Sequence, residues 1–175
     1  MRILFYLLFG LVGLLIQTAV FPRIFPFYLK PDLILVLIVY IGISEKYSSG
    51  GLFSYGLGLL LDVFAGSSLG MYGVIFLLIF FGVRSTICYF NSENPFLLLF
   101  LVFCATLFQA SLLVLLGAFA EAGALWQIVL HHLPGQLLMN VVAAVLLMLV
   151  VTWLQKRFSR LVVPGLQRLD ERYDD

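Results

Sequence analysis

The sequence predicts an all-α integral membrane protein with six transmembrane helices, of which the second and third are short. Hydrophobic residues make up 63% of its 175 residues and charged residues only 11%. The mean hydropathy is +1.12. In a soluble domain about a quarter of the residues are charged, so lipid is the solvent that this composition requires. The net charge of only +1 gives no indication of nucleic-acid binding.

The first predicted helix is the apolar run over residues 3–21, which follows Arg2. A positive residue before an apolar run is also typical of a signal peptide. The residues Gln17-Thr18-Ala19 are a poor cleavage site, however, because they lack the small-x-small pattern. We therefore expect this run to be kept as a membrane helix.

Two shorter apolar runs follow, over residues 33–44 and 51–64. As helices they would span about 18 and about 21 Å, less than the roughly 30 Å of hydrocarbon in a bilayer. They either cross with the help of their flanks or form a re-entrant hairpin among the other helices. We favour six crossings, and the sidedness of the chain is the same for both. The polar turn over residues 45–50 makes the two segments antiparallel.

Three longer runs complete the set, over residues 71–89, 96–120 and 133–154. Pro95 suits the first turn of the fifth helix, where its missing N–H has no intrahelical partner to lose. The longest connection, residues 121–132, is expected to carry a short interfacial helix anchored by Trp126.

The distribution of Lys and Arg predicts that both termini are cytoplasmic. This orientation places eight basic residues inside and only Arg23 and Lys30 outside, although five of the eight lie in the C-terminal tail. We expect residues 1–155 to form a single transmembrane domain. Residues 156–175 then form a cytoplasmic tail, basic first and acidic last, whose basic part lies against anionic headgroups.

Residue patterns typical of catalytic, phosphate-binding or metal-binding sites are scarce. The sequence has no phosphate-binding loop, and Gly66 to Gly70 match G-x-S-x-G only in a turn between two membrane helices, where small residues suffice as an explanation. His131 and His132 are predicted to lie at the outer headgroup level, with Glu121 as the one nearby candidate for a shared metal. We therefore predict no catalytic residues, no cofactor and no metal, and hence no enzyme.

Polar residues inside apolar runs are expected to face other helices or a solute path. They are Gln17, Asp62, Gln109, Gln136 and Asn140. For the amides we favour hydrogen bonds between helices. An aspartate at mid-bilayer costs about 2.5–3.5 kcal/mol, so Asp62 must face protein, water or the outer turn.

Asp32 has a simpler interpretation, because it stands just before the second apolar run, where the free N–H groups and the dipole of a helix start favour a carboxylate. Both aspartates are then expected in the outer half of one hairpin, Asp32 at its beginning and Asp62 at its end.

Two stretches of the chain, KPDLILVLIVYIG and GGLFSYGLGLLLDVFAGSSLGMYGVIFLL, resemble the MreD family of rod shape-determining proteins. Recurrent features of that family are a Pro-Asp-Leu, a Gly-Leu-x-x-Asp and a Leu-Gly, which fall here on residues 31–33, 58–62 and 69–70. The resemblance is sharp over residues 30–75 and rests elsewhere on length and hydropathy.

The resemblance implies a subunit of the elongation machinery in the inner membrane of rod-shaped bacteria, with MreC as its direct partner and with MreB, RodA and a class B penicillin-binding protein in the same complex. It gives a structural or partner-contact role to Pro31, Asp32, Gly58, Asp62 and Gly70. On this reading Asp62 fixes one helix arrangement or pairs with a partner.

The resemblance also implies a fold similar to the substrate-binding S components of energy-coupling-factor vitamin transporters, which supplies the alternative function. Those subunits often carry Ala-x-x-x-Ala on the first helix. This chain has only Ala19 there, and its small residues are Gly10 and Gly13, which favours the cell-shape role.

Overall fold

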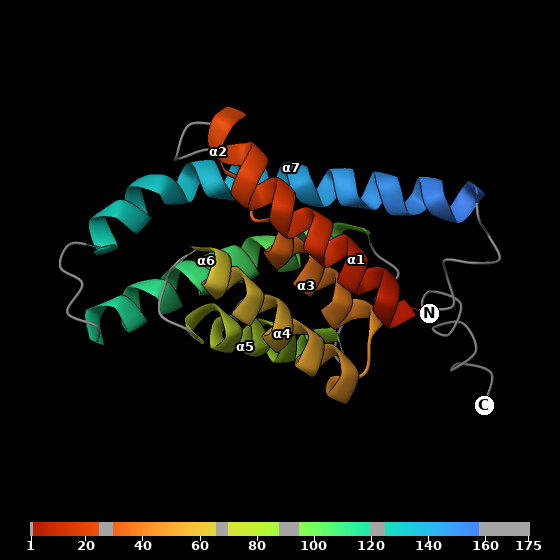
Figure 1. The fold of residues 1–175 in the computed structure, drawn as a ribbon, viewed down its shortest axis with the longest axis horizontal. Coiled ribbons are helices and arrows are strands. Elements are labelled where there is room, and N and C mark those ends of the chain that lie inside the picture. The colour runs from red at the N-terminus through yellow and green to blue at the C-terminus, as the bar shows by residue number, and fades with distance from the viewer. Residues whose placement is uncertain (1, 25–29, 66–69, 88–94, 120–124, 158–175) are drawn as a thin grey trace.

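The protein is all-helical over the residues that its computed structural model describes, which are 2–24, 30–65, 70–87, 95–119 and 125–157. These residues form six helical rods that cross one another at varied angles (Figure 1). The first rod is continuous and has three parts. The elements are α1 (Arg2–Leu15), η1 (Ile16–Val20), α2 (Phe21–Ile24), α3 (Leu33–Ser44), α4 (Tyr47–Ala65), α5 (Met71–Ile87), α6 (Pro95–Phe119) and α7 (Leu125–Arg157).

Three of the rods are long and apolar enough to cross a membrane, within the part of the chain that is described. The qualifying stretches are Tyr6–Arg23, Phe96–Leu115 and Val129–Trp153. Helices α3 and α5 are apolar but shorter, and α4 has 19 residues. The all-helical membrane architecture predicted from composition is thus what the structure has.

The first rod changes its winding near its end. After α1, the five residues of η1 form a π-helical segment, in which the N–H of Phe21 donates to the carbonyl oxygen of Ile16. A π-helical turn widens the helix and rotates the side chains that follow it. The segment carries Gln17, and this side chain reaches the start of α3.

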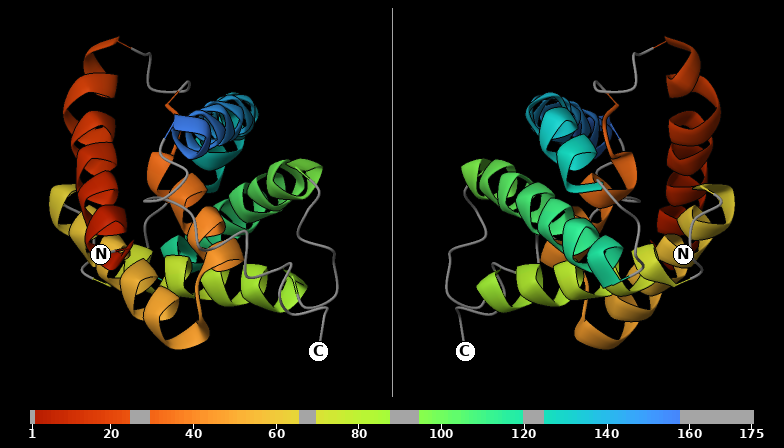
Figure 2. Two further views of the ribbon diagram at one scale, coloured as in Figure 1. Left: turned by 90° about the vertical axis from the view of Figure 1, so that its right-hand side faces the viewer. Right: turned by 90° about the vertical axis from the view of Figure 1, so that its left-hand side faces the viewer.

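Helix α3 is the centre of the bundle. Eight of its twelve residues are buried, and it packs against α1, α4, α5, α6 and α7. Figure 2 shows α3 with α1 on one side, α7 above it and α6 on the other side. A helix that is apolar on all sides is expected in such a position. On α5, Phe76 and Phe80 are fully buried and belong to the same core.

Helices α4 and α5 form a tightly packed antiparallel hairpin in which the two backbones come close together at Gly58 and Gly73. A Cβ atom built on Gly58 would lie 2.6 Å from the Cα of Gly73 and 2.6 Å from the carbonyl oxygen of Tyr72. Only a glycine lets the two backbones meet there. In a bilayer such contacts matter, because helices associate by close packing rather than by escape from water.

Several predicted helix bounds agree with the structure to within about three residues, and two helix starts differ by more. The second run was predicted to cover residues 33–44, which α3 does, and Pro95 opens α6 as expected. Helix α4 starts at Tyr47, earlier than the predicted residue 51. Ser48 and Ser49, which we assigned to the turn, are helical, and the turn consists of two residues, Glu45 and Lys46. The ends predicted at residues 89 and 120 lie outside the described residues.

The second difference is at the start of α7. We predicted a separate interfacial helix within residues 121–132, but residues 125–132 are the first turns of α7, which continues through Pro134. A proline removes one backbone hydrogen bond, and membrane helices tolerate this loss. The side chain of Trp126 lies outside the described part, so its predicted role as an anchor stays a prediction.

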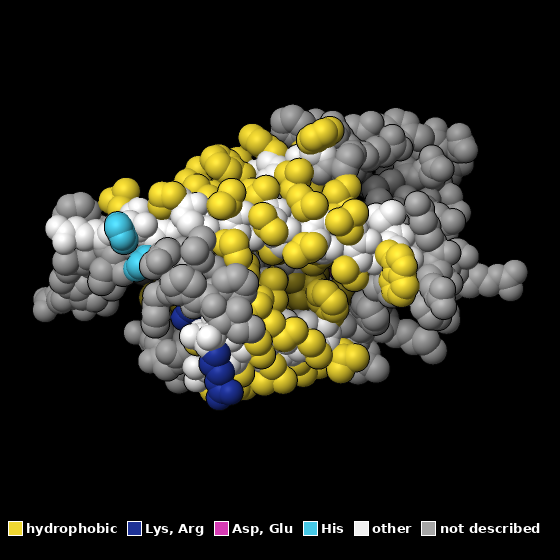
Figure 3. Space-filling view, turned by 90° about the horizontal axis from the view of Figure 1, so that it is seen from above, with side chains coloured by type: hydrophobic (Ala, Val, Ile, Leu, Met, Phe, Trp, Pro, Cys, Tyr) yellow, Lys and Arg dark blue, Asp and Glu magenta, His cyan; other side chains and the backbone are white. Residues whose placement is uncertain are grey.

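The surface of the bundle is apolar along its length. Large hydrophobic side chains are exposed on α6 at Phe96, Phe100 and Phe103, and on α7 at Leu138 and Leu149. Figure 3 shows hydrophobic side chains spread over the face that carries α7. A surface of this kind suits contact with lipid or with other membrane helices.

Replacing Gly58 by alanine is expected to destabilise the hairpin. The new methyl group meets backbone atoms of α5, which cannot move without separating the helices, so we expect a loss of about 1–3 kcal/mol in the free energy of unfolding. Reversible unfolding in detergent micelles, followed by circular dichroism, measures it. Gly56→Ala is the control, because a Cβ at Gly56 has nothing within 4 Å; equal stability of the two variants would contradict the packing argument.

Candidate functional site

The start of α3 is capped by Asp32, which is only 5% exposed. The Asp32 Oδ1 atom accepts a hydrogen bond of 3.1 Å from the backbone N–H of Leu35. The N–H of Val36 donates to the carbonyl oxygen of Asp32 at 3.2 Å. The residue before it, Pro31, is also buried. This helix therefore begins inside the protein, where its free N–H groups cannot turn to water.

Gln17 of η1 completes the cap from another helix. Its Nε2 donates to Asp32 Oδ1 at 3.2 Å, and its Oε1 accepts from the backbone N–H of Ile34 at 3.3 Å. One amide thus binds both the capping carboxylate and one of the N–H groups that the cap leaves free. The π-helical segment brings this amide to the right place.

Helices α6 and α7 also bind Asp32. The Nε2 of Gln109 donates to Asp32 Oδ2 at 2.9 Å, and the backbone N–H of Asp32 donates to Asn140 Oδ1 at 2.6 Å. The Nδ2 of Asn140 in turn donates to Thr106 Oγ1 at 3.0 Å, and that hydroxyl donates to the carbonyl oxygen of Val102. Asp32 therefore connects α3 to the first rod, to α6 and to α7.

The connected side chains lie deep in the bundle. Gln109 and Asn140 are 2% and 0% exposed, and both lie within apolar stretches long enough to span a membrane. The Oε1 atom of Gln109 is buried and accepts no hydrogen bond from the described residues. Hydrogen bonds from amides and from the helix start stabilise the carboxylate of Asp32 at this depth.

Asp62 is the second buried carboxylate, and it caps a helix other than its own. It belongs to α4, but its Oδ2 accepts from the N–H groups of Gly70 at 2.9 Å and Gly73 at 3.3 Å. Its Oδ1 accepts from the N–H of Tyr72 at 3.1 Å. Asp62 is 1% exposed, so the start of α5 obtains its hydrogen bonds from the preceding helix.

Gly70 explains why the cap comes from a distance. Its φ of +96° is in the left-handed region that glycine adopts without strain, and it stands directly before α5, where a Ser, Thr, Asp or Asn side chain usually caps the helix. A glycine has no side chain for this purpose, and Asp62 supplies the acceptor oxygens instead.

Tyr72 belongs to the first turn of α5. Its backbone N–H donates to Asp62 Oδ1 at 3.1 Å. The ring also packs on Phe76, with 5.7 Å between the ring centroids.

Arg84 lies away from this region, toward the end of α5. Its Nη1 donates to the carbonyl oxygen of Ile43 at 3.4 Å, and its guanidinium lies 5.5 Å from the ring centroid of Tyr47. Arg84 therefore contacts the α3–α4 connection. The described part of the chain contains no group of three or more His, Cys, Asp or Glu side chains that could hold a metal.

All five residues singled out from the sequence lie at these two helix starts. Pro31 and Asp32 precede α3, whereas Gly58, Asp62 and Gly70 hold α4 against α5. Sequence reasoning flagged the amides of Gln17, Gln109 and Asn140 as inward-facing but did not bring them together at Asp32. Thr106 was missed, although a hydroxyl within an apolar run is the same kind of signal.

Comparison with known proteins identifies a family. The family model described as rod shape-determining protein MreD matches residues 1–158. No curated protein and no solved structure matches the chain. The expected similarity to the S components of energy-coupling-factor transporters therefore stays a prediction.

Asp62→Leu is expected to lower the free energy of unfolding by about 2 kcal/mol or more, because it removes the acceptors of three N–H groups. Asp62→Asn keeps one carbonyl oxygen and should lose about half as much. Unfolding in detergent measures both changes. The neighbouring variant Val63→Ala is the control, since Val63 is exposed and such a change is usually worth within about 0.5 kcal/mol.

Asp32 and Gln17 are expected to be energetically coupled. Asp32→Leu leaves several buried donors without an acceptor and should cost about 3 kcal/mol. Once Asp32 is replaced, Gln17→Leu should cost less than it does in the unaltered protein, with a coupling free energy of about 0.5–3 kcal/mol. A double-mutant cycle gives this quantity. Thr152→Val, at an exposed position of α7, should be additive with Asp32→Leu, and additivity of Gln17→Leu would refute the shared cap.

Proposed function

From the premise that the chain belongs to the rod shape-determining protein MreD family, we propose that it is a non-catalytic scaffold of the elongation complex in the bacterial inner membrane. In this role it binds MreC directly and keeps MreC near MreB, RodA and a class B penicillin-binding protein. It thereby controls where the peptidoglycan synthases of that complex work, and hence the shape of the cell.

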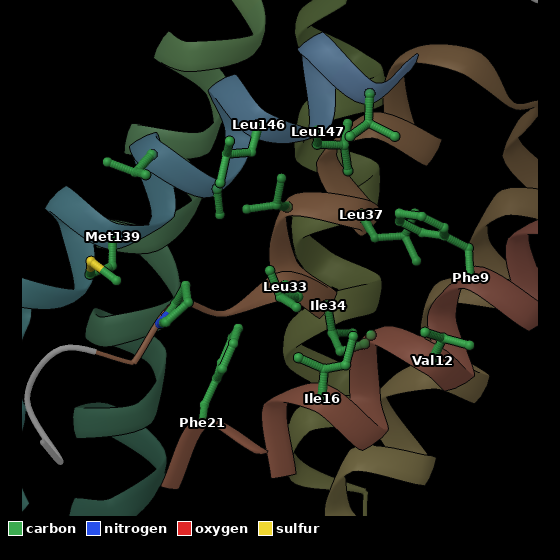
Figure 4. Close-up of a pocket in the computed structure, with 16 residues that line it drawn as sticks. Phe9, Val12, Ile16, Phe21, Leu33, Ile34, Leu37, Met139, Leu146 and Leu147 are labelled. Atoms are coloured by element: carbon green, nitrogen blue, oxygen red, sulfur yellow. The ribbon is translucent and has the colours of Figure 1, made fainter. Parts of the chain in front are cut away.

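The use of the polar side chains supports a scaffold. The carboxylates of Asp32 and Asp62 are bound to backbone and amide donors of the protein itself. A cavity between α1, α3 and α7 is lined by apolar residues (Figure 4), and the outer surface of the bundle is apolar. The observation that carries the proposal is that the buried polar groups hold the helices of this chain together, which leaves its apolar surface for other membrane proteins to bind.

The positions of the basic residues support a multi-pass topology with both termini in the cytoplasm. The start of α1, the α3–α4 connection and the end of α7 lie at the same end of the bundle (Figure 1). Arg2, Lys46, Arg84 and Arg157 belong to these parts or contact them. Basic residues favour the cytoplasmic side. We further propose that residues 1–155 form one transmembrane domain and that the tail, residues 156–175, lies against the headgroups of membrane lipids.

Deletion of the gene is expected to turn rod-shaped cells into rounded cells. The unaltered chain, expressed from its native promoter, should restore the rod and should retain MreC through affinity purification. Asp62→Leu should restore the rod poorly and retain less MreC, because α4 and α5 lose the cap that fixes their arrangement. Phase-contrast microscopy and quantitative pull-down measure the two effects.

Val63→Ala is the matched control, an exposed neighbour of Asp62 that should behave like the unaltered protein. If Asp62→Leu gave normal rods and normal capture of MreC at native expression, Asp62 would have no functional role. A purified chain that carried a stoichiometric vitamin would contradict the scaffold itself and would favour the transporter function.

A further inference from the structure

The two buried carboxylates have different hydrogen-bond partners, and the difference decides which of them can accommodate a proton. The three donors that bind Asp62 are backbone N–H groups at the start of α5. A backbone N–H only donates, so none of the three can accept a hydrogen bond from a protonated carboxyl. The Oδ2 atom of Asp32 is bound instead by the side-chain amide of Gln109, and an amide carries both donors and an acceptor.

Asp32 lies at the depth of the hydrocarbon, although it stands at a helix start. Its backbone N–H donates to Asn140, and Asn140 is near the middle of the 25-residue apolar stretch Val129–Trp153. Gln109 belongs to a second such stretch, Phe96–Leu115. An ionisable side chain at this depth is costly as a charge, and proton relays in membrane proteins are built from such side chains.

The charge of Asp32 is met by neutral donors alone within the described part of the chain. The donors to its two oxygens are Gln17, Leu35 and Gln109. No other titratable side chain that the structure describes on the surrounding helices forms a hydrogen bond or an ion pair with this carboxyl. These side chains are Tyr6 on α1, Arg23 on α2, Tyr40 on α3, Tyr47 and Asp62 on α4, Tyr72 and Arg84 on α5, Cys104 on α6, and His131 and His132 on α7.

The two oxygens of Asp32 are not equivalent. Oδ1 accepts from the N–H of Leu35 and from Gln17 Nε2, and the Gln17 amide is fixed in this orientation because its Oε1 accepts from the N–H of Ile34. A protonated carboxyl keeps one carbonyl oxygen, which still accepts both bonds. Oδ2 accepts only from Gln109 among the described residues. A proton on Oδ2 therefore leaves the cap of α3 intact.

The amide of Gln109 can turn to receive this proton. Its Oε1 is buried and accepts no hydrogen bond from the described residues, so a rotation of the amide breaks no bond of that oxygen. The rotation brings Oε1 to the place of Nε2, which lies 2.9 Å from Asp32 Oδ2. The O–H of the protonated carboxyl then donates to Gln109 Oε1, and the amide has one unpaired group in either orientation.

We propose that Asp32 is a reversible proton-binding site within the membrane and that the Gln109 amide turns when the proton binds. One proton from the aqueous phase forms an O–H bond at Oδ2, the carboxyl changes from a single negative charge to neutral, and no electron is transferred. The orientation of Gln109 in the structure is that of the charged state. Both states keep the cap of α3 and its link to α6. The inference does not depend on the proposed partner.

Infrared difference spectroscopy of the full chain in lipid vesicles, with aspartate labelled by ¹³C at its carboxyl, tests the proposal. An exposed aspartate stays charged between about pH 9 and about pH 6. We expect that acidification over this range adds the C=O band of a neutral carboxylic acid and that return to the starting pH removes it. The band should be at least about tenfold weaker in Asp32→Asn and unchanged in Asp62→Asn, the matched control.

Gln109→Leu tests the acceptor of the proton. The acid band should remain in this variant but move to higher frequency, because the O–H of Asp32 no longer donates a hydrogen bond. Gln136→Leu is the control, since Gln136 is an amide of α7 that does not bind Asp32. It should leave the frequency of the band unchanged.

A stability measurement tests whether the network accommodates the neutral state. Asp32→Asn has the shape of the protonated carboxyl, with an N–H in place of the O–H. Its equilibrium constant for unfolding in detergent should stay within about threefold of the value for the unaltered chain, whereas Asp32→Leu should change it by about a hundredfold.

Each contrary result has a defined meaning. No acid band in the unaltered chain, or a band that persists in Asp32→Asn, overturns the proton site, and so does a band that is lost in Asp62→Asn instead. A frequency that Gln109→Leu leaves unchanged overturns the rotation of the amide. Asp32→Asn that is destabilised as strongly as Asp32→Leu overturns the neutral state of this network. The scaffold function stands after any of these results, because MreC takes no part in the measurements.

Discussion

Backbone N–H groups at two helix starts inside the bundle are the constraint on which this structure depends. The first turn of any helix leaves N–H groups without an intrahelical partner, and hydrocarbon offers them none. At the start of α3 the carboxylate of Asp32 and the amide of Gln17 accept these hydrogen bonds. At the start of α5 the carboxylate of Asp62 does so. Each carboxylate is stabilised by the donors that it satisfies.

These two caps explain how a short helix becomes the centre of the bundle. Helix α3 has 12 residues, too few to span the hydrocarbon alone. Because its start is bound to side chains of η1, α6 and α7, it is held at a fixed depth and the other helices pack around it. The Asp62 cap and the contact of Gly58 with Gly73 hold α4 and α5 together in the same way. The polar groups thus define one arrangement of helices whose remaining contacts are almost all apolar.

Buried hydrogen bonds hold the helices of this bundle in one arrangement, so its outer surface can be apolar without loss of that arrangement. In a bilayer, lipid and protein helices compete for such a surface, and shape complementarity decides between them. The exposed side chains of α6 and α7 are largely apolar and suit contact with lipid or with other membrane helices. The apolar cavity between the first rod, α3 and α7 is lined by helices that the Asp32 network joins through Gln17 and Asn140.

The sequence by itself determined that the protein lies in a membrane and that it is helical, because both follow from composition. It also determined several local features, because these follow from the order of neighbouring residues. Local patterns predicted the bounds of α3 and the Asp32 cap. They also predicted that the side chain of Asp62 must face protein, water or the outer turn rather than lipid. Only the tertiary structure decided that Gln17, Gln109 and Asn140 converge on one carboxylate and that Asp62 caps the helix after its own. Such contacts join residues up to 108 positions apart, and local preference contains no information about which distant helices meet.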